Sequence, residues 1–111
     1  MPNEASNPAY FIGLIQVTDV DSYRREYGRK VVAQLTAVGG KLLVASASPT
    51  MLEGEWQASW TVVIQFPNRD TAMRWYESAE YAPLKKLRIE ELTTAGTVAL
   101  FDGFGPPATA S

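Results

Sequence analysis

The carboxylate of Glu53 is the side chain of this sequence best suited to proton transfer. It lies in the segment MLEGEW, between the apolar residues Met51 and Leu52 and the aromatic Trp56. Partial burial among such neighbours raises a carboxyl pKa toward the range in which the group acts as a general acid or base. The alternative is a carboxylate in a surface turn, which stays in water and has no such role.

Aromatic residues are the candidates for the walls of a ligand cavity. They are Tyr23, Tyr27, Trp56, Tyr76 and Tyr81. Tyr23 and Tyr27 lie four residues apart, so a helix places both on one face. Aromatic walls with a few polar tips suit a small organic ligand. The alternative is core packing, with the hydroxyl groups at the edge of the core.

The composition argues against several kinds of chemistry. The chain has no Cys and no His, so it lacks disulfides, thiol nucleophiles, a His base for a serine nucleophile and the usual ligands of zinc, copper and haem. Its acids occur as scattered pairs, such as Glu53 with Glu55, rather than as a cluster for magnesium or calcium. Glycine-rich nucleotide motifs are also absent. We therefore expect no metal site and no cofactor.

Charge and hydropathy narrow the choice of partners. The 111 residues carry a formal net charge of −2, with ten basic residues spread among twelve acidic ones. Such a chain lacks the basic surface that nucleic-acid binding requires. The start, MPNEASNPAY, does not resemble a signal peptide, and no apolar run reaches membrane-spanning length. We expect a cytoplasmic protein that binds neither nucleic acid nor membrane.

A lone arginine such as Arg74 or Arg88 could still hold a substrate carboxylate, although an arginine of this kind is usually solvated or salt-bridged.

The elements that position these residues follow from apolar periodicity. The sequence predicts strands over 9–17, 41–46, 60–66 and 97–102, a helix between Asp19 and Gly39, a second helix capped by Asn68, and a short third helix from Pro83 to Arg88. Residues 9–103 are expected to form one domain, with flexible ends over 1–8 and 104–111. Glu90 to Ala95 is expected to be a connector.

This order predicts an α+β protein with the ferredoxin-like βαββαβ fold and a four-stranded antiparallel sheet. Two helices cover only one face of such a sheet. The strands over 9–17 and 60–66 nevertheless carry large apolar residues on both faces. A second sheet from another copy of the chain is the natural cover, so we expect a homodimer.

Several motifs resemble a known family. They are Val17, Asp19, Tyr23 and Tyr27 with their spacing, the pair Gly39 and Gly40, the segment LEGEW over 52–56, and the block from Val62 to Arg88. Together they resemble the domain-of-unknown-function family 1330 of the dimeric α/β-barrel superfamily, over nearly the whole chain. The resemblance implies that two ferredoxin-like sheets pair into a barrel. Relatives in that superfamily include cofactor-free monooxygenases, lactone isomerases, dehalogenases and stress-response proteins, and the family itself has no agreed reaction.

Three functions are compatible with these observations. The first is a small-molecule binder or a cofactor-independent enzyme, with monooxygenase-like or isomerase-like proton transfer. The second is a structural or regulatory homodimer without catalysis, which a cavity filled by side chains would favour. The third is an RNA-binding domain with the same order of elements, but the strand WTVVIQF over 60–66 lacks the basic and glycine-aromatic pattern of such domains. We expect the first.

Overall fold

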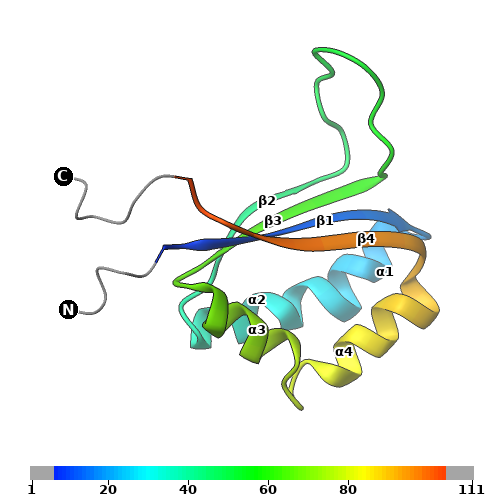
Figure 1. Ribbon diagram of the computed structural model, residues 1–111. Helices are drawn as coiled ribbons and strands as arrows, with labels where there is room; N and C mark the ends of the chain where they lie inside the picture. Colours follow the sequence, from blue (N-terminus) through cyan, green and yellow to red (C-terminus); the bar gives the residue numbers. More distant parts are fainter. Residues whose placement is uncertain (1–6, 105–111) are drawn as a thin grey trace.

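Four antiparallel strands form one sheet, and the helices pack together on one face of it (Figure 1). The computed structural model describes residues 7–104. The elements are β1 (Ala9–Val17), α1 (Val20–Tyr23), the π-helical turn η2 (Arg24–Gly28), α2 (Arg29–Ala37), β2 (Lys41–Ser46), β3 (Trp60–Phe66), α3 (Arg69–Tyr76), α4 (Ala82–Leu87), the π-helical turn η3 (Arg88–Leu92) and β4 (Thr93–Asp102). This is the predicted βαββαβ order, with the first helix divided by η2.

The strand order β2-β3-β1-β4 makes β1 and β3 the central strands. In β1, Ala9, Phe11 and Ile15 are buried against the helices, because alternate residues of a strand point to the same face. Phe11 pairs with Ile64 of β3, which is also buried. The ferredoxin-like arrangement predicted from the sequence is therefore the one observed.

The predicted ends of several elements are also observed. The side chain of Asn68 accepts a hydrogen bond from the Thr71 amide at 2.8 Å, which caps α3. Gly39 follows α2 with φ of 81°, a backbone conformation that favours glycine. The last strand differs from its prediction, because it begins at Thr93 rather than at Thr97. Thr93 pairs with Val17 beyond a register shift in β1, so the expected connector is largely η3 and the start of β4.

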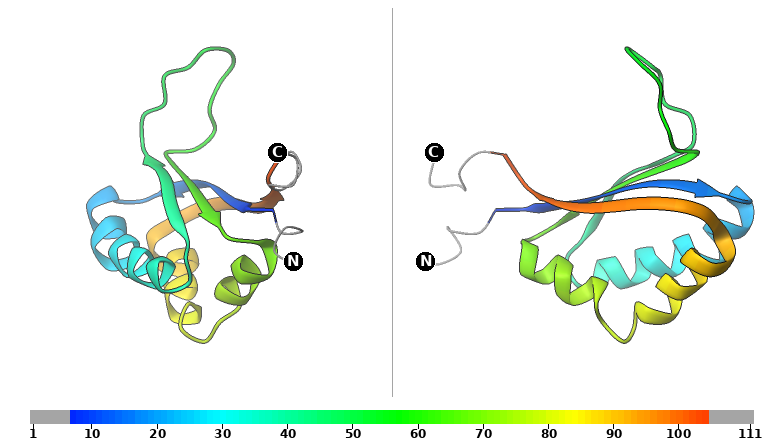
Figure 2. Two further views of the ribbon diagram at one scale, coloured as in Figure 1. Left: turned by 90° about the vertical axis from the view of Figure 1, so that its left-hand side faces the viewer. Right: turned by 45° about the vertical axis from the view of Figure 1, so that its right-hand side comes forward.

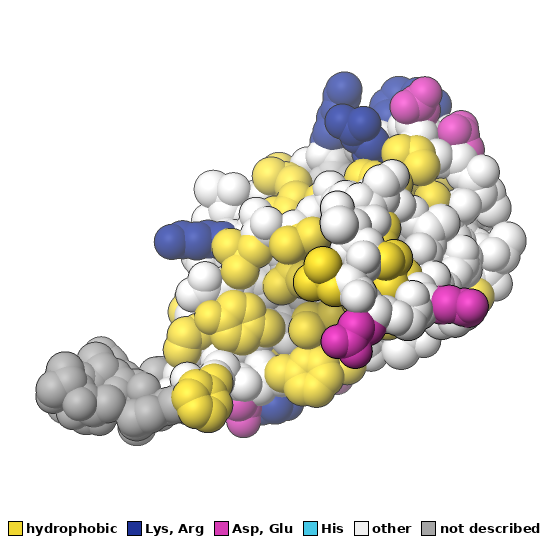
Figure 3. Space-filling model, turned by 90° about the horizontal axis from the view of Figure 1, so that it is seen from above, with side chains coloured by type: hydrophobic (Ala, Val, Ile, Leu, Met, Phe, Trp, Pro, Cys, Tyr) yellow, Lys and Arg dark blue, Asp and Glu magenta, His cyan; other side chains and the backbone are white. Residues whose placement is uncertain are grey.

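The core lies between the sheet and the helices. Phe66 and Tyr81 are fully buried there, and Leu35 and Trp75 are nearly so. The opposite face of the sheet is not covered by any element of residues 7–104 (Figure 3). Tyr10, Ile12, Leu14, Val63 and Phe101 alternate with the buried positions of their strands and so lie on this uncovered face. Its apolar character agrees with the prediction from the sequence.

Residues 47–59, here called the arm, connect β2 to β3 and rise away from the uncovered face of the sheet (Figure 2). They contain no helix or strand, and Leu52 is 90% exposed. The arm is fixed at its base, where Trp56 Nε1 donates a hydrogen bond to Thr61 Oγ1 at 2.8 Å and Gln16 Nε2 donates to the Gln57 carbonyl. The arm therefore extends into solvent beside the apolar face.

Two further predictions concern the ends of the chain and its location. The flexible ends over 1–8 and 104–111 lie, apart from Asn7, Pro8 and Phe104, outside the described residues. Among residues 7–104, none of the helices has the length and apolar character needed to cross a membrane. The cytoplasmic location stays a prediction.

Candidate ligand-binding site

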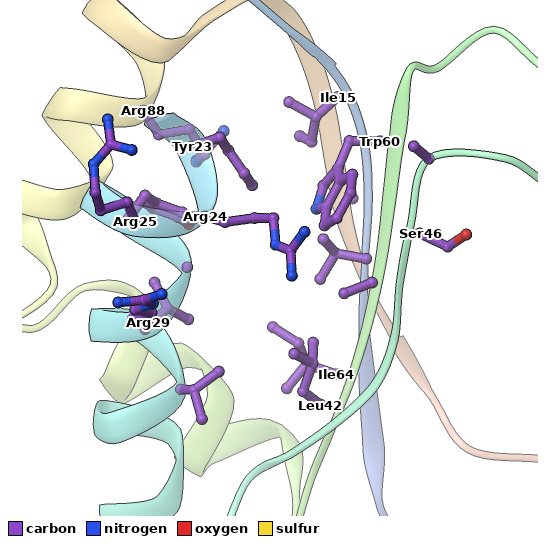
Figure 4. A pocket seen from close by; sticks show the side chains of 18 of the residues that line it. Ile15, Tyr23, Arg24, Arg25, Arg29, Leu42, Ser46, Trp60, Ile64 and Arg88 are labelled. Carbon is purple, nitrogen blue, oxygen red and sulfur yellow. The ribbon is translucent and has the colours of Figure 1, made fainter. Parts of the chain in front are cut away.

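A cavity of about 830 Å³ separates the sheet from the helical stretch α1–η2–α2 (Figure 4). Its volume falls within the range of about 300–1,000 Å³ that is usual for small-molecule sites. Strand side chains form its floor and helical side chains form its wall. The floor includes Phe11, Ile15, Leu42, Trp60, Val62, Ile64 and Val98, and the wall includes Tyr23, Arg24, Tyr27, Val31 and Arg88.

Both π-helical turns carry residues of this cavity. Arg24 and Tyr27 belong to η2, and Arg88 is the first residue of η3. A π turn widens a helix locally by replacing i→i+4 hydrogen bonds with i→i+5 bonds, and such turns are frequent at functional sites. The widened turns therefore lie where the helices and the sheet enclose the cavity.

Tyr23 and Tyr27 form the aromatic part of the wall. Their ring centroids lie 5.0 Å apart, and the Tyr23 ring lies 5.9 Å from that of Trp60. Burial raises the pKa of both hydroxyl groups above the ordinary value, and the positive charge of Arg88 lowers it by a smaller amount. Both tyrosines are therefore neutral at physiological pH. The Tyr23 hydroxyl can donate a hydrogen bond to a ligand oxygen, and the Tyr27 hydroxyl can do so when Tyr81 is the donor of the hydrogen bond between the two.

A short hydrogen bond connects the cavity wall to the core. The hydroxyl oxygens of Tyr27 and Tyr81 lie 2.5 Å apart. Tyr81 does not line the cavity and is fully buried, with its ring centroid 4.2 Å from that of Trp75. Tyr81 thus contacts the site through Tyr27 and fixes the direction in which the Tyr27 hydroxyl points.

Arg88 is the buried cation of the site. Its side chain is 5% exposed, and its Nε atom is buried with no hydrogen-bond partner. No carboxylate of residues 7–104 forms an ion pair with it. Burial lowers the pKa of Arg88, but the neighbouring Tyr81 and Tyr27 raise it, and the net shift is upward. The guanidinium therefore remains charged beside the cavity.

Further cations line the cavity. The Arg24 side chain extends from η2 into the space in front of Trp60 (Figure 4). Arg25 and Arg29 also line the cavity, and Arg25 lies 3.7 Å from the Glu26 carboxylate. The lining includes one acid, Asp21. The arrangement can therefore hold a ligand with an aromatic or apolar body and a negatively charged group.

The residues predicted to bind a ligand lie in different parts of the structure. Tyr23 and Tyr27 both line the cavity, and Tyr81 lies directly behind Tyr27. Tyr76 lines a different and smaller cavity, of about 180 Å³. Trp56 is on the arm and does not line either cavity. Ligand contact by Tyr76, Tyr81 or Trp56 stays a prediction.

Glu53 is on the arm and is exposed. The partial burial that we expected for its carboxylate is absent in the single chain, because the arm extends into solvent instead of folding over the cavity (Figure 2). Glu53 also does not line the cavity that holds Tyr23 and Tyr27. A catalytic role for Glu53 therefore stays a prediction without a structural contact to this cavity.

Arg88, which the sequence allows as a carboxylate-binding residue, is not among the site residues predicted from the sequence. A signal for it is present in the spacing of Leu84, Arg88 and Leu92, which follow one another at intervals of four. All three are buried. An arginine within the apolar stripe of a helix points to the protein interior rather than to solvent, and this pattern would have identified it.

The fold and the cavity define a class of protein, namely ferredoxin-like α+β proteins with a ligand-sized space between sheet and helices. The structure is similar to a protein of unknown function from Rhodopseudomonas palustris, with a TM-score of 0.71 and 15% identity, covering 91% of this chain and 85% of that chain. A dimeric protein of unknown function and ferredoxin-like fold from Bacteroides fragilis matches with a TM-score of 0.57 and 14% identity, covering 86% and 96% of the two chains. These matches confirm the predicted fold.

The chain belongs to the domain-of-unknown-function family 1330, whose model matches residues 8–104. This confirms the resemblance found in the sequence motifs. The fold is also similar to that of SnoaB, a cofactor-independent oxygenase from Streptomyces nogalater, with a TM-score of 0.64 and 12% identity, covering 90% of this chain and 96% of that chain. A comparison with curated proteins gives no match.

Proposed function

We propose that this chain is a homodimer that binds a small organic molecule in the cavity between sheet and helices and acts on it without a metal or nucleotide cofactor. The observation that carries the proposal is the cavity itself, which has a ligand-sized volume and a wall of aromatic and cationic side chains. The fold shared with a cofactor-independent oxygenase supports this kind of chemistry by analogy.

The neutral tyrosines and the buried cation support a role in holding a ligand oxygen. Tyr23 offers a hydroxyl donor, Tyr27 offers a second one when Tyr81 donates to it, and Arg88 offers a fixed positive charge. All three residues line the same cavity. Donors that are positioned in advance stabilise negative charge that develops on a reacting oxygen.

The second function considered, a structural dimer, would be favoured by a cavity filled with side chains. The cavity in this structure is open instead.

Gly13 offers a direct test of the cavity, because it lies in the floor and has no side chain. A Cβ built at Gly13 would meet Val98 and Ile15 at 3.5 Å and 3.6 Å, which are ordinary contacts. We expect Gly13→Leu to extend into the cavity and to reduce binding of the neutral probe 2-naphthamide at least about tenfold, measured by titration calorimetry. Ala33→Leu introduces the same side chain at an exposed helical position outside the cavity and should bind as the wild type does.

Two results of this experiment would contradict the proposal. If the wild-type chain binds neither 2-naphthamide nor the charged analogue 2-naphthoate, the cavity is not a site for bicyclic organic ligands. If Gly13→Leu binds as tightly as the wild type while remaining folded by circular dichroism, the ligand site lies elsewhere.

The uncovered face of the sheet supports the homodimer. Apolar side chains gather across this face (Figure 3), and Phe101 is 53% exposed on it. Burying such a surface against a second copy removes it from water. We expect light scattering at micromolar concentration to give twice the mass of one chain. Ile12→Lys places a charge at the centre of the face and should give a folded monomer.

Ala33→Lys, which places the same charge on the exposed side of α2, is the control and should remain dimeric. A monomer mass for the wild-type chain would refute the dimer. A stable dimer of Ile12→Lys would place the interface on another surface.

A further inference from the structure

Arg88 is an unusual residue for the interior of a small domain. It is 5% exposed and charged, and its Nε atom is buried without a hydrogen-bond partner. Buried charges are normally paired, because a charged group loses its interactions with water on burial and must regain them within the protein. The neighbouring Tyr81 and Tyr27 raise the pKa of Arg88 and so favour its charged form, but no carboxylate of residues 7–104 forms an ion pair with it.

The surroundings of Arg88 leave room for a ligand rather than for a side-chain partner. The residue lines the large cavity together with Tyr23 (Figure 4), and Tyr27 lines it as well. On the sheet side it faces Gly96, where a Cβ atom would lie 3.8 Å from Arg88 Nη1. Gly96 has no side chain that could serve as an acceptor. The missing acceptor of Arg88 can therefore come from a molecule in the cavity.

The charge of the cavity differs from that of the whole protein. The chain has a formal net charge of −2, whereas four arginines and a single acid, Asp21, line the cavity. Arg24 lies on the side of the cavity away from the sheet, with its side chain in the open space (Figure 4). A concentration of one sign of charge in a cleft attracts ligands of the opposite sign.

We propose that the ligand of this cavity is an aromatic carboxylate, whose carboxylate group binds Arg88 while its ring lies against Tyr23 and Trp60. This inference rests on the proposed function, because it names the class of ligand for the same cavity. A planar guanidinium matches a carboxylate in geometry and forms two parallel hydrogen bonds with it. Tyr23 and Trp60, whose ring centroids lie 5.9 Å apart, offer the apolar surface for a ring system.

The experiment compares 2-naphthoate with 2-naphthamide, which have the same ring system and differ in charge. We expect the wild-type chain to bind 2-naphthoate about ten- to a hundredfold more tightly than 2-naphthamide, because a hydrogen bond between charged groups contributes that much to affinity. Arg88→Met keeps the unbranched apolar part of the side chain without the guanidinium and should lose most of the preference for 2-naphthoate. Arg74→Met removes an exposed arginine of α3 outside the cavity and should keep the wild-type preference.

A second measurement does not depend on the folding of the Arg88→Met variant. In the wild-type chain, the NMR resonance of the Arg88 Nε–H group should shift further downfield at saturation with 2-naphthoate than at saturation with 2-naphthamide, because a carboxylate is the stronger hydrogen-bond acceptor. This resonance reports directly on the atom that lacks a partner.

The outcomes separate this inference from the proposed function. Equal binding of the two probes by the wild-type chain would overturn the carboxylate assignment and leave the cavity as a binding site for neutral molecules. A preference for 2-naphthoate that persists undiminished in Arg88→Met would overturn the assignment to Arg88. The absence of binding for both probes would overturn the inference and the proposed function together.

Discussion

The Phe66→Ala variant is expected to lose about 3–5 kcal/mol of unfolding free energy, because it leaves a cavity at the centre of the core. Phe66 is fully buried at the end of β3, and its ring centroid lies 5.6 Å from that of Trp75. A domain of this size has a total stability of about 5–15 kcal/mol, so the variant should be close to unfolding. The measurement is chemical denaturation followed by tryptophan fluorescence.

Phe104→Ala provides the matched control, because it is the same chemical change at a fully exposed position. We expect its unfolding free energy to differ from that of the wild type by less than about 0.5 kcal/mol. All three proteins must be compared at one concentration, since association stabilises the folded state by mass action. Equal losses for the two variants would show that burial at Phe66 does not determine stability.

The sheet could be predicted because its signals are local. The alternation of apolar residues in β1 and β3 determines which side chains point to the helices, and it also reveals the second apolar face. Asn68 and Gly39 marked helix ends through capping and backbone geometry. Each of these signals depends on neighbours in the sequence, so it can be recognised without the tertiary structure.

The start of β4 and the two π turns could not be predicted, because they depend on contacts between distant residues. β4 extends back to Thr93 because that residue pairs with Val17 of β1, across a register shift. The π turn η3 begins at Arg88 and ends at Leu92, and both of these residues are buried. Intrinsic propensities do not distinguish such a turn from a regular helix.

The site was predicted in part. The spacing of Tyr23 and Tyr27 placed both on one helical face, and the structure brings both to the cavity. Glu53 was chosen because its neighbours in the sequence are apolar, but those neighbours are themselves exposed on the arm. Apolar neighbours in a loop do not guarantee burial, whereas an apolar stripe in a helix does, and that stripe identifies Arg88.

Stability is expected to fall steeply above about pH 10 because two tyrosines are buried in their neutral form. Burial raises the pKa of Tyr23 and Tyr27 in the folded chain, and the charge of Arg88 offsets only part of that rise. The unfolded chain loses these protons near the ordinary tyrosine pKa, so at higher pH the unfolded state binds fewer protons than the folded state. Stability is therefore fully present below that pH and is lost as the pH rises, by about 1.4 kcal/mol per pH unit for each tyrosine.

Tyr27→Phe removes one of the two titrating groups and tests this account. At neutral pH it should lower the unfolding free energy by about 1–3 kcal/mol, because the buried Tyr81 hydroxyl loses its partner at 2.5 Å. Above pH 10 its stability should fall less steeply than that of the wild type, by about 1.4 kcal/mol per pH unit, so the two curves approach each other. Val31→Ala, one helical turn further along the same buried face, removes packing but no proton and should keep the wild-type slope. Parallel curves for the wild type and Tyr27→Phe would show that Tyr27 does not retain its proton in the folded chain.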